Sequence, residues 1–449
     1  MAHVAVIMTG LTGNLHASLE LASRFKKEGN KITYLAIRDV KIKVENNGFN
    51  YIQLPEITHS ISTEDLGLTQ GATWFKKFIF SLRDKRNNHK KIEDLLKLEE
   101  YKNIIASIKP DITIIDRELH DIIFAVFSLK IPIVISTTWF SNKMGSGLKL
   151  PPIRTNIIPG KGIKGTSLFI LFNWIYIKLK VRARIIANKI FFKDYRRQGL
   201  LNYANKVGFP IKEIVASNLP NLFVYPYIKT LSMTMSEMDF NHIPDKELHY
   251  IGPMVFESRD NNASSKISEK LKTIFNQKLN DNKKLIFCSV STLVSGDIIF
   301  LKKLISAVSN VNNYQLIITL GDKIDKNIFK NTPENVYLFN WVPQLEVLKH
   351  ADLNINHGGI NSINECIHFK VPMLVYSGKN FDQNGCAARI HYHRLGIMGD
   401  KDKDSSKEIK ENLETILSNK IYTENLNKFN KIYLNYQQKN LSKILKLKS

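Results

Sequence analysis

The sequence predicts an α/β protein of two doubly wound domains, each with a parallel sheet covered by helices on both faces. Two observations lead to this prediction. Short β-rich runs alternate with helical patterns before residue 140, and the same alternation starts again after residue 284. Strands that alternate with helices are typical of parallel sheets, in which ligands bind at the carboxyl ends of the strands.

The N-terminal half begins with a strand, a glycine-containing loop and a helix. Residues 4–9 are rich in β-formers, residues 10–14 read Gly-Leu-Thr-Gly-Asn, and residues 16–29 carry apolar side chains at helical spacing up to Gly29. Further buried strands are expected over residues 31–37, 111–116 and 131–137.

The C-terminal half repeats this order after a polar segment. Residues 257–270 contain the run Asn-Asn-Ala-Ser-Ser, which is typical of a linker or an exposed loop. We therefore place a linker at residues 255–283. Strands of the second domain are expected over residues 285–291, 314–320, 335–341, 352–356 and 371–376.

Composition restricts the classes of protein without choosing a function. The chain has 449 residues, of which 43% are hydrophobic, so it is globular. Three cysteines are too few for a disulfide framework or a zinc site, which favours reduced thiols in the cytoplasm. The start lacks a basic leader, and no apolar run reaches the roughly 18–20 residues of a spanning helix.

A formal net charge of +23 would attract nucleic acid, an anionic membrane or an anionic substrate. A composition that is simply rich in Lys, Asn and Ile explains it equally well. A metal site is not expected. Asp400, Asp402 and Asp404 resemble the DxD of metal-dependent sugar transferases, but they lie in a Lys- and Ser-rich turn that is typical of a solvated loop.

The most informative segment is 341–383. A strand ending at Asn356 leads into His357-Gly358-Gly359, and a helix is expected from about Asn361. Two glycines let a ligand approach the backbone, and a helix start offers free N–H groups and the positive end of the dipole. With the side chains of Asn361 and Ser362, this arrangement predicts a diphosphate site.

Two further residues extend this site toward a nucleotide. Glu365, one turn into the helix, can accept hydrogen bonds from ribose hydroxyls, and Trp341 offers a flat face to a base. A tight turn, a helix-capping glutamate and a core tryptophan would be the purely structural interpretation. All the features together favour a nucleotide.

This segment resembles the signature of the UDP-glycosyltransferases, an inverting family with the GT-B fold, and in particular the bacterial macrolide and zeaxanthin type. The matching residues are Trp341, Pro343, Gln344, His350, His357, Gly359, Asn361, Ser362, Glu365, Val371, Pro372, Asp382 and Gln383.

The resemblance implies a role for each residue of the donor site. Uracil would stack on Trp341 and pair with the backbone of Val342. The ribose would bind Gln344 and Glu365. The remaining predicted residues are His357, Gly358, Gly359, Asn361 and Ser362 for the phosphates, Asp382 and Gln383 for the sugar hydroxyls, and Ser291 as a further donor contact.

The sequence departs from the family pattern in the loop that reads the sugar. The usual Gly-Val-Pro is Lys370-Val371-Pro372, Ser377 replaces a proline, and one extra residue precedes Gln383. Glucose is the default donor sugar that the Asp-Gln pair implies, and this loop makes the sugar less certain than UDP.

A larger departure affects the catalytic base. The family's N-terminal loop carries a histidine held by a buried aspartate, and the corresponding residues here are Asn14 and Asp116. An asparagine cannot accept a proton at neutral pH. Three hypotheses remain: His16 pairs with Asp116, Asp116 acts directly, or the enzyme is impaired. We favour His16 with Asp116, although a histidine at a helix start is often a capping or surface residue.

The segment 161–200 combines ten Lys and Arg residues with many aromatic ones and a single acidic residue. Its apolar part is too short to span a bilayer and suits an interfacial segment or the border of the acceptor cleft. An ordinary buried helix followed by a solvated basic helix explains it equally well. Lipid suits this clustering better than nucleic acid, which we do not expect as a partner.

Together these features predict a metal-independent, inverting transferase that moves a hexose from a UDP-sugar to a hydroxyl of a small hydrophobic acceptor. Two alternatives stay open: a peripheral-membrane lipid or carotenoid glycosyltransferase, and an impaired UDP-sugar-binding protein. The expected domains are an acceptor-binding domain at 1–254, a nucleotide-sugar-binding domain at 284–430, and a C-terminal helix at 431–449 that packs back on the first domain.

Overall fold

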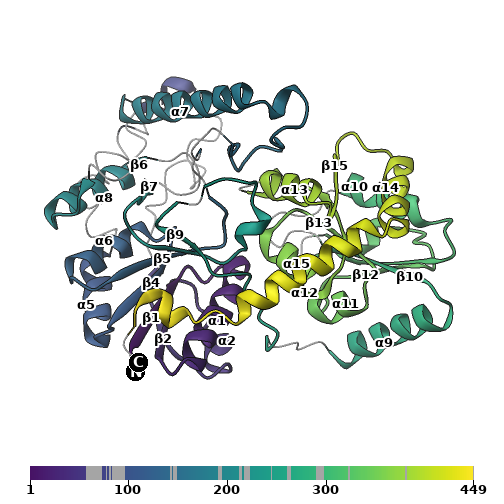
Figure 1. Cartoon of the computed structure of the whole chain (residues 1–449), viewed down its shortest axis with the longest axis horizontal. Coiled ribbons are helices and arrows are strands. Elements are labelled where there is room, and N and C mark those ends of the chain that lie inside the picture. Colours follow the sequence, from purple (N-terminus) through teal and green to yellow (C-terminus); the bar gives the residue numbers. More distant parts are fainter. Residues whose placement is uncertain are drawn as a thin grey trace.

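Figure 1 shows two α/β bodies side by side, each with its own sheet, in a computed structural model of the chain. The residues that the structure describes are 1–56, 73–76, 78–79, 82, 97–141, 144, 149–190, 195–211, 215–216, 223–243, 245–259, 264–289, 298–321, 324–379 and 382–447.

The first sheet has seven parallel strands in the order β3-β2-β1-β4-β5-β8-β9. Its strands are β1 (His3–Met8), β2 (Lys31–Ala36), β3 (Asn50–Gln53), β4 (Ile112–Asp116), β5 (Ile133–Thr137), β8 (Thr230–Ser232) and β9 (Leu248–Tyr250). A separate antiparallel pair joins β6 (Val215–Ala216) to β7 (Phe223–Val224).

The second sheet has six parallel strands in the order β12-β11-β10-β13-β14-β15. They are β10 (Lys284–Ser289), β11 (Tyr314–Thr319), β12 (Val336–Phe339), β13 (Leu353–Asn356), β14 (Met373–Tyr376) and β15 (Gly396–Gly399). The two parallel sheets confirm the predicted fold class.

Helices cover both faces of each sheet. The helices of the N-terminal half are α1 (Thr12–Lys27), α2 (Lys41–Glu45), α5 (Leu98–Ile108), α6 (His120–Ser128), α7 (Ser167–Ile190) and α8 (Tyr195–Lys206). Those that follow are α9 (Ser265–Asn280), α10 (Ile298–Val308), α11 (Gln344–His350), α12 (Ile360–Phe369), α13 (Gln383–Tyr392), α14 (Ser406–Ser418), α15 (Ile421–Gln437) and α16 (Leu441–Leu445).

Strand β1 shows why the sheet needs helices on both faces. Val4, Val6 and Met8 pack in one core, while Ala5 and Ile7 pack in another on the opposite face. Successive side chains of a strand point to opposite faces, so a strand that is apolar throughout must be covered twice.

The predicted linker contains a helix. Helix α9 buries Leu271, Ile274 and Phe275 in the same core as Leu285 and Phe287 of the second sheet. These apolar side chains are spaced three and four residues apart, which is a helical pattern within a polar sequence.

The C-terminal helices return to the first domain (Figure 1). Arg24 of α1 donates to the carbonyl oxygens of Tyr436 and Lys439, both at 2.9 Å, and Glu28 accepts from the backbone N–H of Ser442 at 2.7 Å. Gly252 lies against Tyr436, where a Cβ would come within 2.3 Å of that side chain. Helix α15 begins at Ile421, so the predicted division at residue 430 falls inside a helix.

A buried ion pair joins the two bodies. Arg389 of α13 donates to Asp239 of the first domain at 2.5 and 2.9 Å, and both side chains are almost completely buried. Tyr250 donates to the other oxygen of Asp239 at 3.0 Å. This network fixes α13 against the first domain and therefore helps to set how the two sheets face each other.

The three cysteines, Cys288, Cys366 and Cys386, are free and buried, as expected of reduced thiols. Among the described residues, no helix is long and apolar enough to cross a membrane.

Candidate active site

The loop after β13 brings the backbone close to a neighbouring helix start. Gly358 has a φ of +83°, and a Cβ there would lie 2.8 Å from the carbonyl oxygen of Gln383. Asn356, the last residue of β13, accepts from the N–H of Gly358 at 2.9 Å. Both the dihedral angle and the close approach require glycine at this position. The chain then turns directly into α12 at Ile360.

Asn361 joins this helix start to the first domain. Its side-chain amide donates to the backbone carbonyl of Gly13 in α1, while Ser362 beside it is half-buried. The amino ends of α12 and α1, which belong to different sheets, are thus neighbours. Two helix amino ends at one place concentrate partial positive charge and free N–H groups, which attracts an anion.

Glu365 is buried and doubly hydrogen-bonded. One carboxylate oxygen accepts from the side chain of Gln344 at 2.5 Å, and the other accepts from Arg259 at 2.8 Å. Gln344 begins α11, so the predicted ribose-binding pair does come together. Arg259 was not predicted, because it lies in the polar segment interpreted as a linker, where nothing in the local pattern distinguishes it.

His357 is half-buried beneath the glycine loop. Burial lowers the pKa of its imidazole to about 4, although the neighbouring backbone of Ser289 partly opposes this shift. A Cβ on Gly359 would lie 2.7 Å from its Nε2, so the ring lies directly against this loop. The imidazole is therefore neutral at pH 7 and can act there as a hydrogen-bond donor rather than as a cation.

The residues around β12 and α11 divide into exposed and buried ones. Trp341 is 47% exposed, so about half of this residue is open to solvent, while Val342 is buried. His350, which belongs to the matching motif, stacks on Phe275 of α9 with ring centroids 4.0 Å apart. Its role is therefore packing.

Asp382 and Gln383 lie at the start of α13, and both are buried. Burial raises the pKa of the Asp382 carboxyl to about 6, while Cys386 donates to it at 3.5 Å and Arg117 and Arg389 stabilise its charge. Ser291, the remaining predicted donor residue, lies outside the described residues.

Asp116 ends β4 and is buried, with its carboxylate already hydrogen-bonded. Asn14 donates to Oδ2 at 3.2 Å, Thr9 donates to the same oxygen at 3.4 Å, and the backbone N–H of Glu118 donates to Oδ1 at 3.2 Å. Burial raises the pKa of this carboxyl, and these hydrogen bonds oppose the shift.

His16 does not form the predicted pair with Asp116. Helix α1 already begins at Thr12, earlier than the sequence indicated, so Asn14 and His16 both lie within it. Residues two apart in a helix point about 200° apart, so only Asn14 reaches Asp116. Burial, followed by the charges of Arg259 and Lys43, lowers the pKa of His16 to about 4.

Glu118 is a second carboxyl that the sequence analysis missed. It is half-buried two residues after β4, and its charge interacts with Asp116 and Arg117 and, from the second domain, with Asp382. Burial and the nearby negative charges raise its pKa to about 7, while Arg117 opposes this shift. The sequence contained a sign of this residue. Glu118 comes two residues after Asp116, the last residue of β4, and ligands bind at the carboxyl ends of parallel strands.

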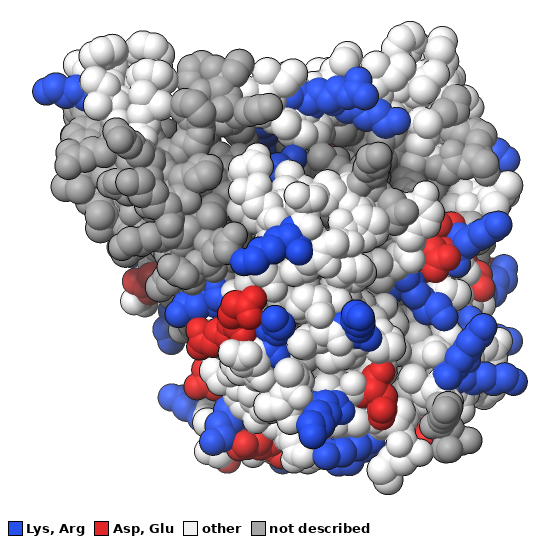
Figure 2. All heavy atoms as spheres, turned by 90° about the vertical axis from the view of Figure 1, so that its left-hand side faces the viewer, with Lys and Arg blue, Asp and Glu red and all other residues white. Residues whose placement is uncertain are grey.

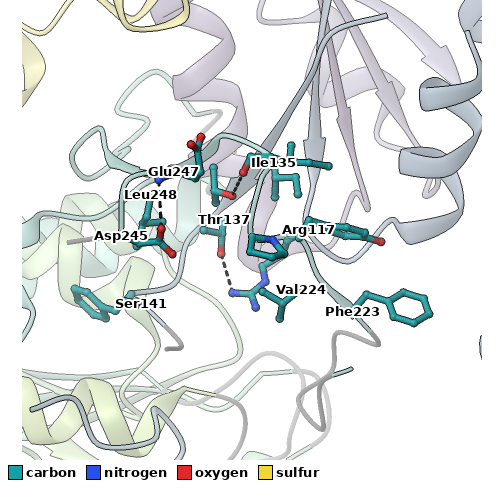
Figure 3. Close-up of a pocket in the computed structure, with 14 residues that line it drawn as sticks. Arg117, Ile135, Thr137, Ser141, Phe223, Val224, Asp245, Glu247 and Leu248 are labelled. Carbon is teal, nitrogen blue, oxygen red and sulfur yellow. Dashed lines mark hydrogen bonds between the residues drawn. The ribbon is translucent and has the colours of Figure 1, made fainter. Parts of the chain in front are cut away.

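A cavity of about 90 Å³ lies beside this edge of the first sheet (Figure 3). Arg117 projects along one side and donates to Thr137 of β5 at 3.2 Å. Its guanidinium also lies 4.5 Å from the ring centroid of Trp139. Apolar side chains from β5, β7 and the following loop form much of the remaining wall, including Ile135, Phe140, Phe223, Val224, Tyr225 and Ile228.

The aspartates of the DxD-like turn have protein partners. Asp402 pairs with Lys379, and Asp404 accepts from the hydroxyl of Tyr376 at 3.0 Å. Within the described ranges, no group of three or more His, Cys, Asp or Glu side chains could hold a metal ion.

Comparisons with known proteins agree with this arrangement. Residues 302–435 match the family described as the erythromycin biosynthesis protein CIII-like, C-terminal domain. "Uncharacterized UDP-glucosyltransferase YdhE" of Bacillus subtilis is 35% identical over 152 residues, which are 34% of this chain and 38% of that protein. The zeaxanthin glucosyltransferase of Pantoea ananas is 28% identical over 171 residues, 37% of this chain and 36% of that protein. Each match thus spans less than two-fifths of the relative's length.

Similarity of fold extends over the whole chain. The solved glycotransferase of kitacinnamycin has a TM-score of 0.64 at 17% identity and covers 99% of this chain and 98% of its own. The glycosyltransferase VinC in complex with dTDP has a TM-score of 0.61 at 12% identity, with 99% of both chains covered.

The chain has two domains with parallel sheets, and the start of α12, which follows Gly358 and Gly359, faces the first domain. This arrangement is the GT-B fold. Within that class, the C-terminal part of the chain is similar to UDP-glycosyltransferases of the macrolide and zeaxanthin type, and the family match covers residues 302–435.

Proposed function

We propose that this protein is an inverting glycosyltransferase that moves a hexose, glucose by default, from a UDP-sugar to a hydroxyl of a small hydrophobic acceptor. The observation that carries the proposal is Glu365, held by Gln344 one turn inside the helix whose amino end faces α1. The names of YdhE and of the zeaxanthin enzyme support a glucose donor.

In this proposal the donor lies along the carboxyl edge of the second sheet. Uracil stacks on Trp341, the ribose hydroxyls donate to Glu365, and the diphosphate meets the N–H groups at the start of α12. Ser362, Gly358 and Gly359 belong to that start, and Asp382 and Gln383 hold the sugar hydroxyls. This assignment rests on the position of each residue and on the family pattern.

The leaving diphosphate is stabilised without a metal. Two helix amino ends and the neutral His357 are hydrogen-bond donors that are already in place as charge develops on the diphosphate. Arg259 adds a positive charge beside Glu365.

Glu118 is the base in this proposal. Asp116 is buried and both of its oxygens already accept hydrogen bonds, whereas Glu118 is half-buried and has a pKa of about 7. A base is most effective when its pKa is close to the working pH. Glu118 takes the proton of the acceptor hydroxyl as that oxygen attacks the anomeric carbon, and UDP leaves on the opposite side.

The acceptor enters beside the first sheet. The apolar walls of the cavity near Thr137 and Arg117 suit a hydrophobic molecule. Arg117 follows the carboxyl end of β4, Thr137 ends β5, and Glu118 is the residue after Arg117 in the chain. Only the edge of the acceptor would fit in this volume of about 90 Å³.

Donor binding is tested by thermal unfolding with UDP, UDP-glucose, UDP-galactose, UDP-N-acetylglucosamine and dTDP-glucose. A ligand at about 100 times its dissociation constant stabilises the folded protein by roughly 2.7 kcal/mol. We expect stabilisation by uridine nucleotides that Glu365→Ala abolishes and that Glu346→Ala, a change on the surface of α11, leaves intact. A protein that no uridine nucleotide stabilises would contradict the donor assignment.

Catalysis is tested by acceptor-dependent release of UDP over a range of pH. We expect the rate to rise with pH through about 7, and Glu118→Gln to lower kcat by about 10²–10⁴-fold while UDP affinity is retained. Loss of this pH dependence in Asp116→Asn but not in Glu118→Gln would transfer the role to Asp116. If the protein binds UDP but no hydroxylated acceptor causes UDP to be released from the UDP-sugar, a nucleotide-sugar-binding protein is favoured. Asn14 at the base position is the reason to consider this alternative.

A further inference from the structure

Helix α7 has two apolar faces, of which one packs against other described residues and the other has exposed side chains. On the covered face, Ile170 is buried and the indole N–H of Trp174 donates to the carbonyl oxygen of Leu150 at 2.8 Å. Ile177 lies on the same side of the helix and is half-buried. These contacts fix how the helix is rotated about its own axis.

The opposite face carries large apolar side chains in solvent. At about 100° per residue, five of these positions fall within about 60° of one another around the helix, so they form a single stripe along its length. Their exposed fractions are 62% for Leu168, 59% for Phe172, 42% for Ile175, 58% for Leu179 and 59% for Ile186. We call these five residues the α7 stripe.

Basic residues border the α7 stripe on both sides. The same helical geometry puts Lys178 and Arg182 along one side and Lys180 along the other, and all three are exposed. The sequence of α7 contains no acidic residue. The stripe is therefore an apolar surface inside a positively charged border.

On the face drawn in Figure 2, the charged residues near the top of the molecule have the same sign as those of α7. Helix α7 lies along the top of Figure 1, and the top stays at the top in the turned view of Figure 2. In the upper third of Figure 2, several Lys and Arg side chains are visible among the described residues and no Asp or Glu.

We propose that the α7 stripe docks this protein onto the surface of an anionic lipid membrane. The helix would lie in the plane of the interface, with the stripe inserted among the upper acyl chains and the basic side chains reaching the phosphates. It would not cross the bilayer. The inference does not depend on the proposed glycosyl transfer.

Charge distinguishes a lipid surface from a second copy of the chain. If two stripes packed on each other, Lys178, Lys180 and Arg182 of one copy would lie near the same residues of its partner, and like charges at an interface oppose association. An anionic leaflet instead offers negative charge around an apolar interior, which matches both parts of this surface.

The test is sedimentation with vesicles, made either of phosphatidylcholine alone or of equal parts phosphatidylcholine and phosphatidylglycerol. We expect the full chain to bind the anionic vesicles at about 0.1 M salt, and to bind less at about 1 M salt because the charges are then screened. Little binding to phosphatidylcholine alone is expected.

Two variants separate the apolar and the basic parts. Phe172→Gln with Leu179→Gln, and separately Lys178→Gln with Lys180→Gln and Arg182→Gln, should each weaken binding to anionic vesicles about tenfold or more. The matched control carries Leu279→Gln, Lys266→Gln and Lys272→Gln on the exposed face of α9, and should bind like the parent. Unchanged melting temperatures verify that each variant is folded.

Several results would overturn the proposal. The proposal is wrong if the full chain does not bind anionic vesicles, or if the α9 control loses as much binding as the stripe variants. It is also wrong if the stripe variants bind as well as the parent. A dimer in solution that the stripe variants make monomeric would instead assign this surface to a second copy. UDP-induced stabilisation is measured on the same variants, so a failure of membrane docking is distinguishable from a failure of the donor site.

Discussion

The guanidinium of Arg259 lies 2.8 Å from one carboxylate oxygen of Glu365. Their side chains are only 13% and 8% exposed, so the pair is shielded from water. Arg259 comes from the segment that joins the two sheets, and Glu365 comes from the helix proposed to bind the donor. The connection between the domains thus contributes directly to the candidate nucleotide site.

Replacing Arg259 by alanine should weaken both folding and donor binding. Removing one partner of a buried ion pair leaves the other charge uncompensated, which costs about 3 kcal/mol of unfolding free energy. Glu365 also loses the contact that orients it toward the ribose, so the dissociation constant of UDP should rise about tenfold, a change of about 1.4 kcal/mol. Urea unfolding and calorimetric titration with UDP measure the two effects.

Arg259→Lys is the control for this prediction, because it keeps the positive charge but not the planar guanidinium. It should retain most of the stability and of the UDP affinity. If Arg259→Ala bound UDP more tightly than the parent, the arginine would compete with the ribose for Glu365, and its assignment as a supporting residue would be wrong.

Asn14 donates to Asp116 from the position where the family pattern has its basic histidine. Asn14→His should therefore supply a base that Asp116 already faces. We expect kcat to increase by about tenfold or more above the pKa of the new imidazole. Initial rates of UDP release with a hydroxylated acceptor, measured from pH 5 to pH 9, test this expectation.

The gain from Asn14→His should depend on Asp116. Adding Asp116→Asn to the histidine variant should remove most of the increase, because the ring loses the carboxylate that orients it. Asn14→Ala should give no increase. A histidine variant that is no faster than the parent would indicate that the new imidazole does not reach the acceptor hydroxyl, so that Glu118 remains the only proposed base.

Sequence patterns predicted the fold, and they also selected residues of the candidate donor site that the structure brings together, because both depend on local order. The alternation of strands and helices determines two parallel sheets, and the run from Trp341 to Gln383 puts its chemistry on the edge of one of them. Gln344 and Glu365 are 21 residues apart, yet they meet because α11 and α12, the helices before and after β13, pack against each other.

The catalytic half depended on details that periodicity does not fix. A shift of α1's start to Thr12 rotates His16 away from Asp116. Arg259 contacts Glu365 across 106 residues of chain, and the polar segment around Arg259 gives no local sign of this contact. Glu118 follows a strand end, which was a usable sign, but its interaction with Asp382 of the second domain has no counterpart in the local pattern.

Gly358 is expected to be irreplaceable. Its φ of +83° disfavours any side chain, and a Cβ would lie 2.8 Å from the backbone oxygen of Gln383. Gly358→Ala should cost about 2 kcal/mol of unfolding free energy and lower UDP affinity at least tenfold, because the starts of α12 and α13 must separate. Thermal unfolding with and without UDP measures both.

Gly13 offers a matched control for that change. It lies in α1 without a positive φ, and nothing lies within 4 Å of the position that a Cβ would occupy. Gly13→Ala should stabilise the protein by about 0.5–1 kcal/mol, since alanine loses less entropy in a helix. Equal effects of the two substitutions would contradict the argument from close approach.

Acid should destabilise the protein in part through His16. The pKa of its imidazole is about 4 in the folded chain, against 6.5 ordinarily, because of burial and then the charge of Arg259. The unfolded chain therefore binds the proton first as the pH falls. Stability from this group is complete above about pH 6.5 and is lost as the pH falls toward 4, by at most about 3 kcal/mol.

Unfolding free energies at pH 7 and pH 5 for the parent and for His16→Gln isolate this contribution. Their comparison is needed because Glu20, whose pKa burial raises to about 7, changes stability in the opposite direction over this range. The variant should lose less stability between the two pH values. A loss as large as that of the parent would mean that the imidazole is protonated without cost.

The pair of Arg389 and Asp239 should be the most costly polar contact to break between the domains. Both side chains are about 1% exposed or less, and two guanidinium nitrogens donate to one carboxylate oxygen. Arg389→Met keeps much of the apolar volume beside Phe140 and Phe240 but leaves Asp239 charged and buried. Unfolding free energy should fall by about 3–5 kcal/mol.

The surface pair of Lys407 and Glu411 is the comparison for this prediction. Its side chains are 85% and 58% exposed, so Lys407→Met should change stability by less than about 0.5 kcal/mol. Because Arg389 fixes α13 against the first domain, its loss should also let the two domains unfold in separate steps during urea denaturation. A single transition with an unchanged midpoint would show that the remaining contacts between the domains hold them together without this ion pair.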